Sequence, residues 1–226
     1  MQTQNTIRTV PPSVNVASTF LKPASLSGTS ASLAAVRHFA AAHEVFGEGD
    51  NATHFYKVQS GVVRTCRLLA DGRRHIEAFH GEGEIFGLEA GGQHRFSAQT
   101  LTECTVTVYR SCNAAILAGR DEALARELFS CAMRSMARAQ EHAILVGSRS
   151  AIEKVAAFLV GCAIKATDRR TIWLDMTRVD IADYLGMTIE TVSRTLSLLE
   201  RDQVIDITSA RQITLRKFEY LEELCA

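Results

Sequence analysis

The chain has 226 residues, of which 46% are hydrophobic and 22% charged, and equal numbers of basic and acidic side chains give a formal net charge of zero. That length is enough for two modest domains, each with its own core. No apolar run reaches the roughly 20 residues that cross a bilayer, so we expect a soluble globular protein and no membrane partner. The neutral charge balance excludes recognition of a nucleic acid through net charge alone, so any basic residues that bind one must act locally.

Residues 1–30 are rich in Ser, Thr, Pro, Gln and Asn and lack apolar periodicity, which predicts a flexible tail. The segment also lacks the basic start and apolar stretch of a secretory signal, so the expected location is the cytoplasm. Six cysteines are scattered without a CxxC pair or zinc-type spacing, and most are expected to be reduced and buried: Cys66, Cys104, Cys112, Cys131, Cys162 and Cys225.

Residues 31–120 are predicted to form a small antiparallel β-roll or barrel. From about Phe46 to Arg110, short β-prone runs alternate with glycines, as in FYKVQSG, VVRTCRLLADG, RRHIEAFHGEG and LTECTVTVYR. The pair Asp71-Gly72 is a strong signal for a two-residue hairpin turn.

Residues 121–149 contain no proline, one late glycine and many strong helix formers, which predicts a single helix of about seven turns. Apolar residues recur along it at spacings of three to five, namely Leu124, Leu128, Cys131, Met136, Ala139, Ala143 and Val146. Such a long stripe on a helix between two domains favours a symmetric dimer interface. Packing on the chain's own β-roll is the alternative.

Residues 150–226 are expected to form a C-terminal domain that opens with an amphipathic helix, AIEKVAAFLVGCAIKA, and ends with a short one, KFEYLEEL. Between them, Thr177 followed by Asp180 is a capping-box arrangement that starts a helix. Gly186 ends that helix, and the turn Gly186-Met187-Thr188 leads to a second threonine-capped helix. This layout predicts a helix-turn-helix, whose second helix enters the major groove of DNA.

The second helix has two faces. One is expected to be buried, with Ile189, Val192, Leu196 and Leu199. The other carries polar groups that can bind base edges, and we predict base contacts from Glu190, Ser193, Arg194 and Ser197. For Glu190 and Arg194 the alternative is an exposed i,i+4 ion pair without a role in recognition.

Two alternating strands, VIDIT and QITLR, follow the second helix and are joined across Ser209-Ala210-Arg211, which completes a winged helix-turn-helix. The candidates for contacts with the DNA backbone are Arg178, Thr188, Arg211, Arg216 and Lys217. Each of them alone is equally compatible with an ordinary surface residue.

The segment MTRVDIADYLGMTIETVSRTLSLLERDQVI resembles the DNA-binding signature of the CRP/FNR superfamily, and its E-T-V-S-R core, Glu190 to Arg194, is similar to that of the FNR and FixK branches. The similarity extends back through VAAFLV and GEIFGLEAGGQHRFSAQ to about residue 35. It implies an α+β fold with a β-roll (jelly roll) like that of cyclic-nucleotide-binding domains, a long dimerisation helix and a winged helix-turn-helix. It also implies that Glu190, Ser193 and Arg194 read half-sites of the TTGAT…ATCAA type.

The resemblance implies a transcription regulator, with activation the expected sign, that binds palindromic double-stranded DNA as a homodimer. Its β-roll would present surface to RNA polymerase, at genes of low-oxygen respiration or nitrogen fixation. A repressor without polymerase contact would share the same chemistry, differing only in promoter geometry.

Relatives that bind cyclic nucleotides use a G-E-L turn and an Arg-Ser pair, whereas this chain has Gly87-Leu88-Glu89 and Arg95-Phe96-Ser97. We therefore expect Glu89 and Arg95 to form a structural or interdomain ion pair, with nucleotide binding as the alternative. No cysteine precedes Cys66, which argues against the N-terminal iron–sulfur cluster of FNR-type sensors.

Redox control by a cysteine just before the helix-turn-helix does not carry over, because Met176 and Thr177 stand there. Thiol switches at Cys131 or Cys225 remain open as alternatives to inert thiols, as does haem or nitric-oxide sensing through His75, His80, His94 or His142. A cupin-like metalloenzyme using His75, His80 and His94 is the remote alternative, without supporting ligand spacing. We expect no enzyme activity, metal or cofactor, and DNA binding that needs no small-molecule effector.

Overall fold

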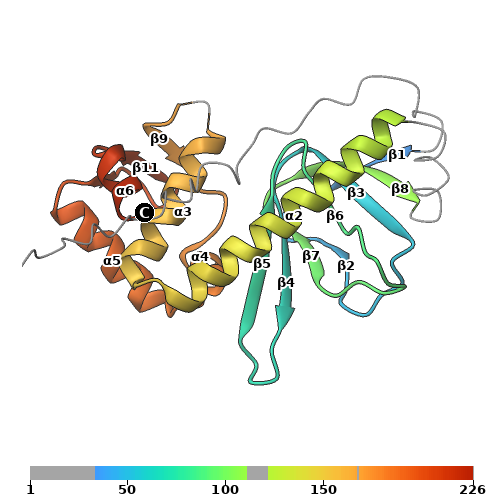
Figure 1. Ribbon diagram of the computed structural model, residues 1–226, viewed down its shortest axis with the longest axis horizontal. Helices are drawn as coiled ribbons and strands as arrows, with labels where there is room; N and C mark the ends of the chain where they lie inside the picture. The colour runs from blue at the N-terminus through green and yellow to red at the C-terminus, as the bar shows by residue number, and fades with distance from the viewer. Residues whose placement is uncertain (1–33, 111–121, 167, 226) are drawn as a thin grey trace, which may run out of the picture.

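The computed structural model describes residues 34–110, 122–166 and 168–225, and Figure 1 shows a β-rich unit and a helix-rich unit joined by the long helix α2. The expected tail, residues 1–30, lies outside the described residues, as does Cys112. The order of elements follows the predicted succession of a β-roll, a long helix and a C-terminal helical domain.

The β-roll consists of two four-stranded antiparallel sheets, with strand orders β1-β8-β3-β6 and β2-β7-β4-β5. The strands are β1 Ala34–Phe39, β2 Glu44–Phe46, β3 His54–Ser60, β4 Val63–Leu68, β5 Arg74–His80, β6 Ile85–Phe86, β7 Ser97–Thr100 and β8 Cys104–Arg110. Side chains alternate in burial along them, and the sheets enclose a core that includes Val58, Val63, Phe86, Ala98 and Val106.

The hairpin between β4 and β5 turns at the predicted Asp71-Gly72 pair. Gly72 has a φ of +81°, and its amide donates to the Leu69 carbonyl. A further bond from Leu69 N to Arg73 O leaves residues 70–72 as the connection, one residue longer than predicted. The glycine is therefore needed at this turn because its backbone is left-handed.

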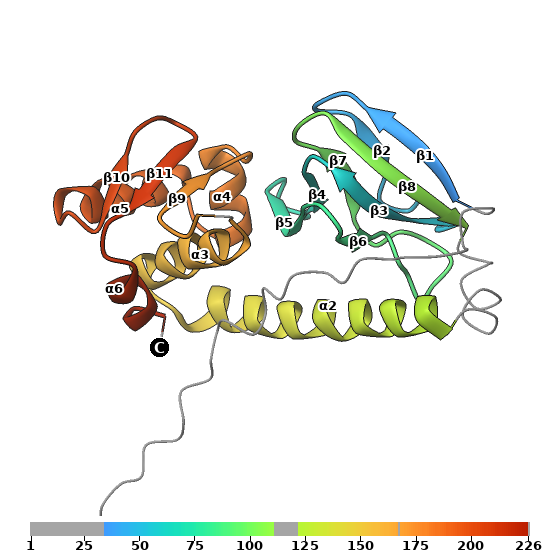
Figure 2. The same ribbon diagram turned by 90° about the horizontal axis from the view of Figure 1, so that it is seen from above.

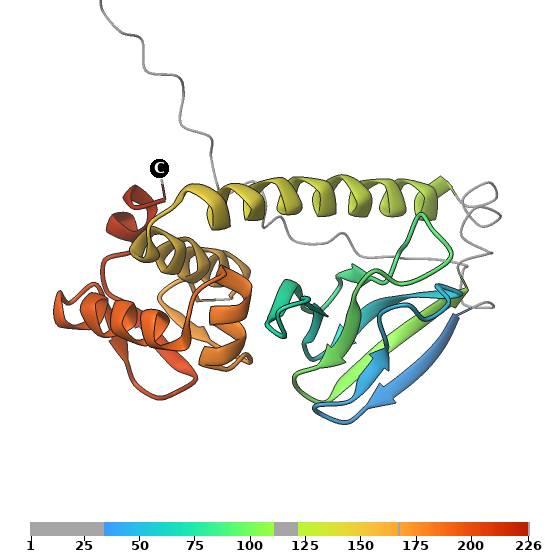
Figure 3. The same ribbon diagram turned by 90° about the horizontal axis from the view of Figure 1, so that it is seen from below.

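Helix α2, Glu122–Ser148, has 27 residues, in agreement with the predicted single helix. Both the β-roll and the C-terminal domain lie on the same side of it (Figures 2 and 3). On that side Cys131 is buried, and Leu128 packs with it against Phe55, Ile85 and Tyr109. The opposite side leaves large apolar side chains exposed: Phe129, Met133, Met136 and Ile144.

The prediction for the dimer face of α2 needs correction on this point. Leu128 and Cys131 pack on the chain's own β-roll, which was the alternative, and Val146 is half-buried beside the turn at Gly186. Met136, Ala139 and Ala143 lie on the exposed side, while the side chain of Leu124 is outside the described ones. The predicted set, chosen by spacings of three to five, combined residues from two faces of α2. One apolar stripe packs on the β-roll, and the other lies on the exposed side.

The C-terminal domain surrounds its own core, which includes Leu159, Ile172, Leu185, Leu199 and Ile213. Its elements are α3 Ala151–Lys165, β9 Thr171–Trp173, α4 Arg178–Leu185, α5 Ile189–Arg201, β10 Ile205–Ile207, β11 Gln212–Leu215 and α6 Phe218–Glu223. The wing is a sheet of order β10-β11-β9, so the two predicted strands have a third neighbour, β9, that the sequence analysis did not identify. None of the helices in the described ranges is both long and apolar enough to cross a membrane.

Candidate nucleic-acid interface

Helix α4 begins with the predicted capping box. The Thr177 hydroxyl accepts a hydrogen bond from Asp180 N at 3.2 Å, and Asp180 Oδ2 accepts one from Thr177 N at 2.9 Å. These bonds satisfy two backbone amides that would otherwise lack partners at the helix start. Asp180 is buried, so the first turn of α4 is held in place within the domain and does not fray.

The turn between α4 and α5 is set by Gly186, which has φ +62° and ψ +41°. The amides of Gly186 and Met187 both bond to the Ala182 carbonyl, which terminates α4. A Cβ added at Gly186 would lie 3.0 Å from Val146 Cγ1, so the turn also abuts the end of α2. Both the backbone angle and this close approach favour glycine.

Helix α5 starts at its predicted cap, where the Thr188 hydroxyl accepts from Thr191 N at 3.3 Å. Val192, Leu196 and Leu199 are buried as predicted, together with Thr195, whose hydroxyl donates to the Thr191 carbonyl. Ile189 differs from the prediction because its side chain is exposed. It occupies the first turn of the helix, beyond the core of the domain.

The opposite face of α5 exposes all four predicted base-reading residues, namely Glu190, Ser193, Arg194 and Ser197. Hydrogen bonds from the backbone amide of Glu190 and from the Thr188 hydroxyl, supported by the charge of Arg194, lower the pKa of the Glu190 carboxyl. The carboxylate is therefore ionised at neutral pH and can accept from an exposed base amine. A guanidinium, two hydroxyls and a carboxylate on one exposed helix face can bind the edges of base pairs.

The five candidates for backbone contacts lie in different surroundings. Thr188 and Arg211 are exposed. Arg216 pairs with Asp206 at 2.9 Å across the wing, and Lys217 Nζ donates to the Asp202 carbonyl at 3.0 Å. Arg178 is half-buried, which lowers the pKa of its guanidinium. Of the five, Thr188 and Arg211 have the freest access to a phosphate.

Within the β-roll, Glu89 and Arg95 form the expected structural ion pair. Arg95 Nε donates to Glu89 Oε2 at 2.8 Å, and Arg95 N donates to Glu89 Oε1 at 3.2 Å. Nearby, the ring of His94 stacks on Phe46 with centroids 3.7 Å apart, and Phe46 stacks in turn on Tyr56 and Phe86. The carboxylate that a ribose would need is thus already bonded to the chain's own arginine.

His80 is buried inside the roll, and burial lowers its pKa to about 4. Thr65 donates its hydroxyl proton to Glu77 at 2.7 Å, because a carboxylate can only accept. The same oxygen lies 3.0 Å from His80 Nε2 and therefore accepts from it, which assigns the proton of the neutral ring to Nε2. Within the described ranges, no group of three or more His, Cys, Asp or Glu side chains could hold a metal ion.

The two cysteines considered as thiol switches are both buried. Burial raises the pKa of Cys131, and it raises that of Cys225 to about 11. A thiol with a raised pKa forms little thiolate at neutral pH, so both environments oppose oxidation. Cys66 and Cys162 are half-buried free thiols.

Comparison with known proteins bears on both domains. The family model for a Crp-like helix-turn-helix domain matches residues 153–224, and that for a cyclic nucleotide-binding domain matches residues 36–112. The nitrogen fixation regulation protein FixK of Rhizobium meliloti is 40% identical over 205 residues, which are 91% of this chain and 92% of that protein. The chain belongs to the CRP/FNR family of transcription regulators.

Other CRP/FNR relatives agree. The FixK protein of Azorhizobium caulinodans is 42% identical over 191 residues, covering 82% of this chain and 77% of that protein. The solved structure of FixK2 from Bradyrhizobium japonicum is 38% identical, with a TM-score of 0.81 over 86% of this chain and 98% of that one. The predicted fold, with its β-roll and winged helix-turn-helix, is thereby confirmed.

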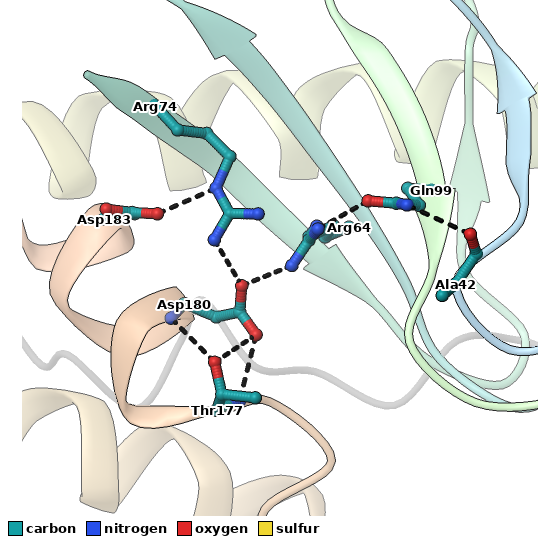
Figure 4. A network of polar contacts seen from close by, with 7 residues as sticks. All are labelled: Ala42, Arg64, Arg74, Gln99, Thr177, Asp180 and Asp183. Carbon is teal, nitrogen blue, oxygen red and sulfur yellow. Dashed lines mark hydrogen bonds and ion pairs between the residues drawn. The ribbon is translucent and has the colours of Figure 1, made fainter. Parts of the chain in front are cut away.

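The residues that join the DNA-binding domain of this CRP/FNR regulator to its β-roll were not predicted from the sequence. Arg64 of β4 and Arg74 of β5 bind carboxylates of α4, as Figure 4 shows. Asp180 was interpreted only as a helix cap, and the hairpin arginines carried no motif. No local pattern indicated the pairing, because the burial of Asp180, which makes a cationic partner necessary, is known only from the fold.

Proposed function

We propose that this CRP/FNR regulator is a homodimeric transcription activator that binds palindromes of the TTGAT-N4-ATCAA type. The observation that carries the proposal is the exposed face of α5, where Glu190, Ser193, Arg194 and Ser197 stand on a capped helix behind a glycine turn. Arg194 would donate to guanine O6 and N7, and Glu190 would accept from cytosine N4. Thr188 and Arg211 would fix the register through phosphate contacts.

The exposed side of α2 supports the homodimer. Phe129, Met133 and Met136 are 68%, 45% and 49% exposed and lie on one helix face at spacings of four and three. That spacing is the repeat of a two-helix seam, and a face so apolar is costly in water. Pairing two copies there would set their recognition helices roughly 34 Å apart, one turn of DNA.

The contacts around Glu89 in the β-roll support binding without a small-molecule effector. Glu89 is bonded to Arg95, and Phe46 and His94 stack in van der Waals contact beside it. In this proposal the β-roll serves as a scaffold and a contact surface for RNA polymerase, and the amount of protein sets activity in the cytoplasm. Its role is regulatory rather than enzymatic. Because the relatives named above are nitrogen fixation regulation proteins, the proposed targets are genes of nitrogen fixation or low-oxygen respiration.

Fluorescence anisotropy of the purified full chain tests the proposal, with a TTGAT-N4-ATCAA duplex and a scrambled duplex, in air and without oxygen, with and without cyclic AMP. We expect selective binding to the palindrome under all conditions. Selectivity only with the nucleotide would identify a nucleotide-responsive regulator, and selectivity only without oxygen a redox-responsive one. Equal binding to both duplexes throughout would overturn the half-site assignment.

A further inference from the structure

The β-roll and the DNA-binding domain are joined by two arginines and two aspartates (Figure 4). Arg74 Nη2 lies 2.7 Å from Asp180 Oδ1, and its Nε lies 2.8 Å from Asp183 Oδ2. Arg64 also binds Asp180 Oδ1, and its other terminal nitrogen donates to Gln99 on β7. We name these four charged residues, Arg64, Arg74, Asp180 and Asp183, the interdomain clamp.

The clamp is largely shielded from water. The side chain of Asp180 is 2% exposed, and that of Arg64 13%. The second carboxylate oxygen of Asp180, Oδ2, accepts hydrogen bonds from the amide and the hydroxyl of Thr177. The one carboxylate therefore caps α4 and also binds two guanidinium groups. Buried ion pairs contribute little net stability but demand one geometry, since a displaced partner leaves a buried charge unpaired. The clamp therefore fixes orientation more than it adds stability.

Contacts of two further residues, His142 and Glu84, support the same junction. His142 of α2 lies 2.7 Å, through Nε2, from the carbonyl of Tyr184 in α4, and the two rings stack with centroids 4.4 Å apart. Glu84, which precedes β6, binds Arg138 of α2 at 3.3 Å and Lys165 of α3 at 3.0 Å. Helices α3 and α4 are thus both tied to the β-roll and to α2, the proposed dimer helix.

We infer that Arg64 and Arg74 are positioning residues for DNA recognition: by binding Asp180 and Asp183 they hold α4, and through it α5, at a fixed angle to α2. The inference rests on the proposed function, and it supplies a physical reason why no effector is needed. A dimer reads two half-sites at once only if both recognition helices have the correct separation and direction. The clamp fixes that direction permanently, so the binding-competent orientation is always populated.

Weakening the ion pairs of the clamp should leave each recognition helix folded but allow its angle to α2 to vary. Binding to one half-site then keeps its affinity, since each helix still makes its own contacts. Simultaneous binding to both half-sites weakens, because the orientation must be restored on binding. A swinging domain also accepts other half-site spacings, so the preference for one spacing declines.

The variants Arg74→Gln and Asp183→Asn, separately and combined, test this inference, because both leave Asp180 in place to cap α4 and to pair with Arg64. Arg73→Gln is the matched control, since Arg73 neighbours Arg74 but pairs with the exposed Asp71 of its own hairpin. Anisotropy is measured on three duplexes: the palindrome with four central base pairs, one with five, and a single half-site. The extra base pair turns one half-site by roughly 35° about the DNA axis.

We expect the wild-type protein and Arg73→Gln to prefer four central base pairs, and Arg74→Gln to reduce that preference about tenfold with half-site affinity unchanged. The double variant should be no worse than Arg74→Gln alone, because that change already removes the Arg74–Asp183 contact that Asp183→Asn weakens. An unchanged spacing preference in Arg74→Gln and Asp183→Asn would overturn the inference, and so would equal losses on all three duplexes with an unchanged melting curve.

Hydrogen exchange without DNA separates this inference from the proposed function. Arg74→Gln should increase exchange of amides in both β5 and α4, and Arg73→Gln should not. If the wild-type protein fails to select the palindrome while this exchange effect is present, the proposed function fails and the clamp stands. If the palindrome is selected but Arg74→Gln changes neither the spacing preference nor the exchange, the inference about the clamp fails and the proposed function stands.

Discussion

Among single residues, Arg194 has the most direct chemical role in the proposed interface, since its guanidinium is exposed on the reading face of α5. Arg194→Ala should weaken binding to the palindrome by about 1–3 kcal/mol and relax the preference at the guanine of each half-site, because a bidentate contact is lost. Arg211→Ala, an exposed candidate for phosphate contact, should weaken specific and scrambled duplexes alike. Anisotropy on base-substituted duplexes measures both variants, and equal losses on all sequences for Arg194→Ala would contradict base reading.

His80 makes stability depend on pH. Its pKa is about 4 in the folded protein, against an ordinary value of 6.5, because burial disfavours the charged ring. Between pH 6.5 and 4 the unfolded chain therefore binds the extra proton, and the free energy of unfolding should fall as the pH falls through this window. The loss amounts to about 3 kcal/mol. The pKa of the ring is also raised by the charges of Glu77 and Glu84 and lowered by those of Arg138 and Lys165.

Urea denaturation at several pH values measures this effect in the wild-type protein and in His80→Gln. Because the charge of His80 also lowers the pKa of Glu84, the difference between the two curves reports the ring together with its effect on that carboxylate. The slope between pH 6.5 and 4 should be shallower in His80→Gln than in the wild-type protein. Parallel curves for the wild-type protein and His80→Gln would show that the ring is not held neutral.

At the scale of elements, the turn of the helix-turn-helix depends on Gly186. Gly186→Ala should lower the free energy of unfolding by about 1–2 kcal/mol, because alanine is strained at positive φ and its Cβ would crowd Val146. Gly72→Ala is the matched control: it has the same kind of backbone in the hairpin turn, but nothing lies near its Cβ position. We expect Gly72→Ala to show the backbone cost without loss of DNA binding, and equal effects of the two changes would argue against the contact with Val146.

Helices α4 and α5 also show how far local sequence determines an element. Each cap, and the turn, depends on residues only a few positions apart. Thr177, Asp180, Gly186 and Thr188 could therefore be identified before any tertiary contact was known. The exposure of Ile189 could not be predicted in this way, because helical periodicity predicts a face but not where the core beneath that face ends. The third wing strand, β9, was missed for a related reason: its three residues pair with β11, far along the chain.

At the scale of the whole molecule, the exposed face of α2 should hold two copies together. Met136→Arg should convert the dimer to monomer at micromolar concentration and weaken binding to the palindrome at least tenfold, because it places a charge in an apolar seam. Leu68→Arg changes another exposed apolar residue, at the end of β4 and away from α2, and should do neither. Size-exclusion chromatography with light scattering measures the oligomeric state, and a dimer that persists in Met136→Arg would place the interface elsewhere.

The sequence by itself determined the succession of a β-roll, a long helix and a winged helix-turn-helix, and it identified the exposed residues of α5, because caps, turns and periodicity are local. Only the tertiary structure decided which face of α2 packs on the roll and which remains exposed, since two apolar stripes share that helix. It alone brought Arg64 to Asp180, 116 residues apart in sequence. Such a pairing is invisible to local patterns, because it arises only when two separately folded domains meet.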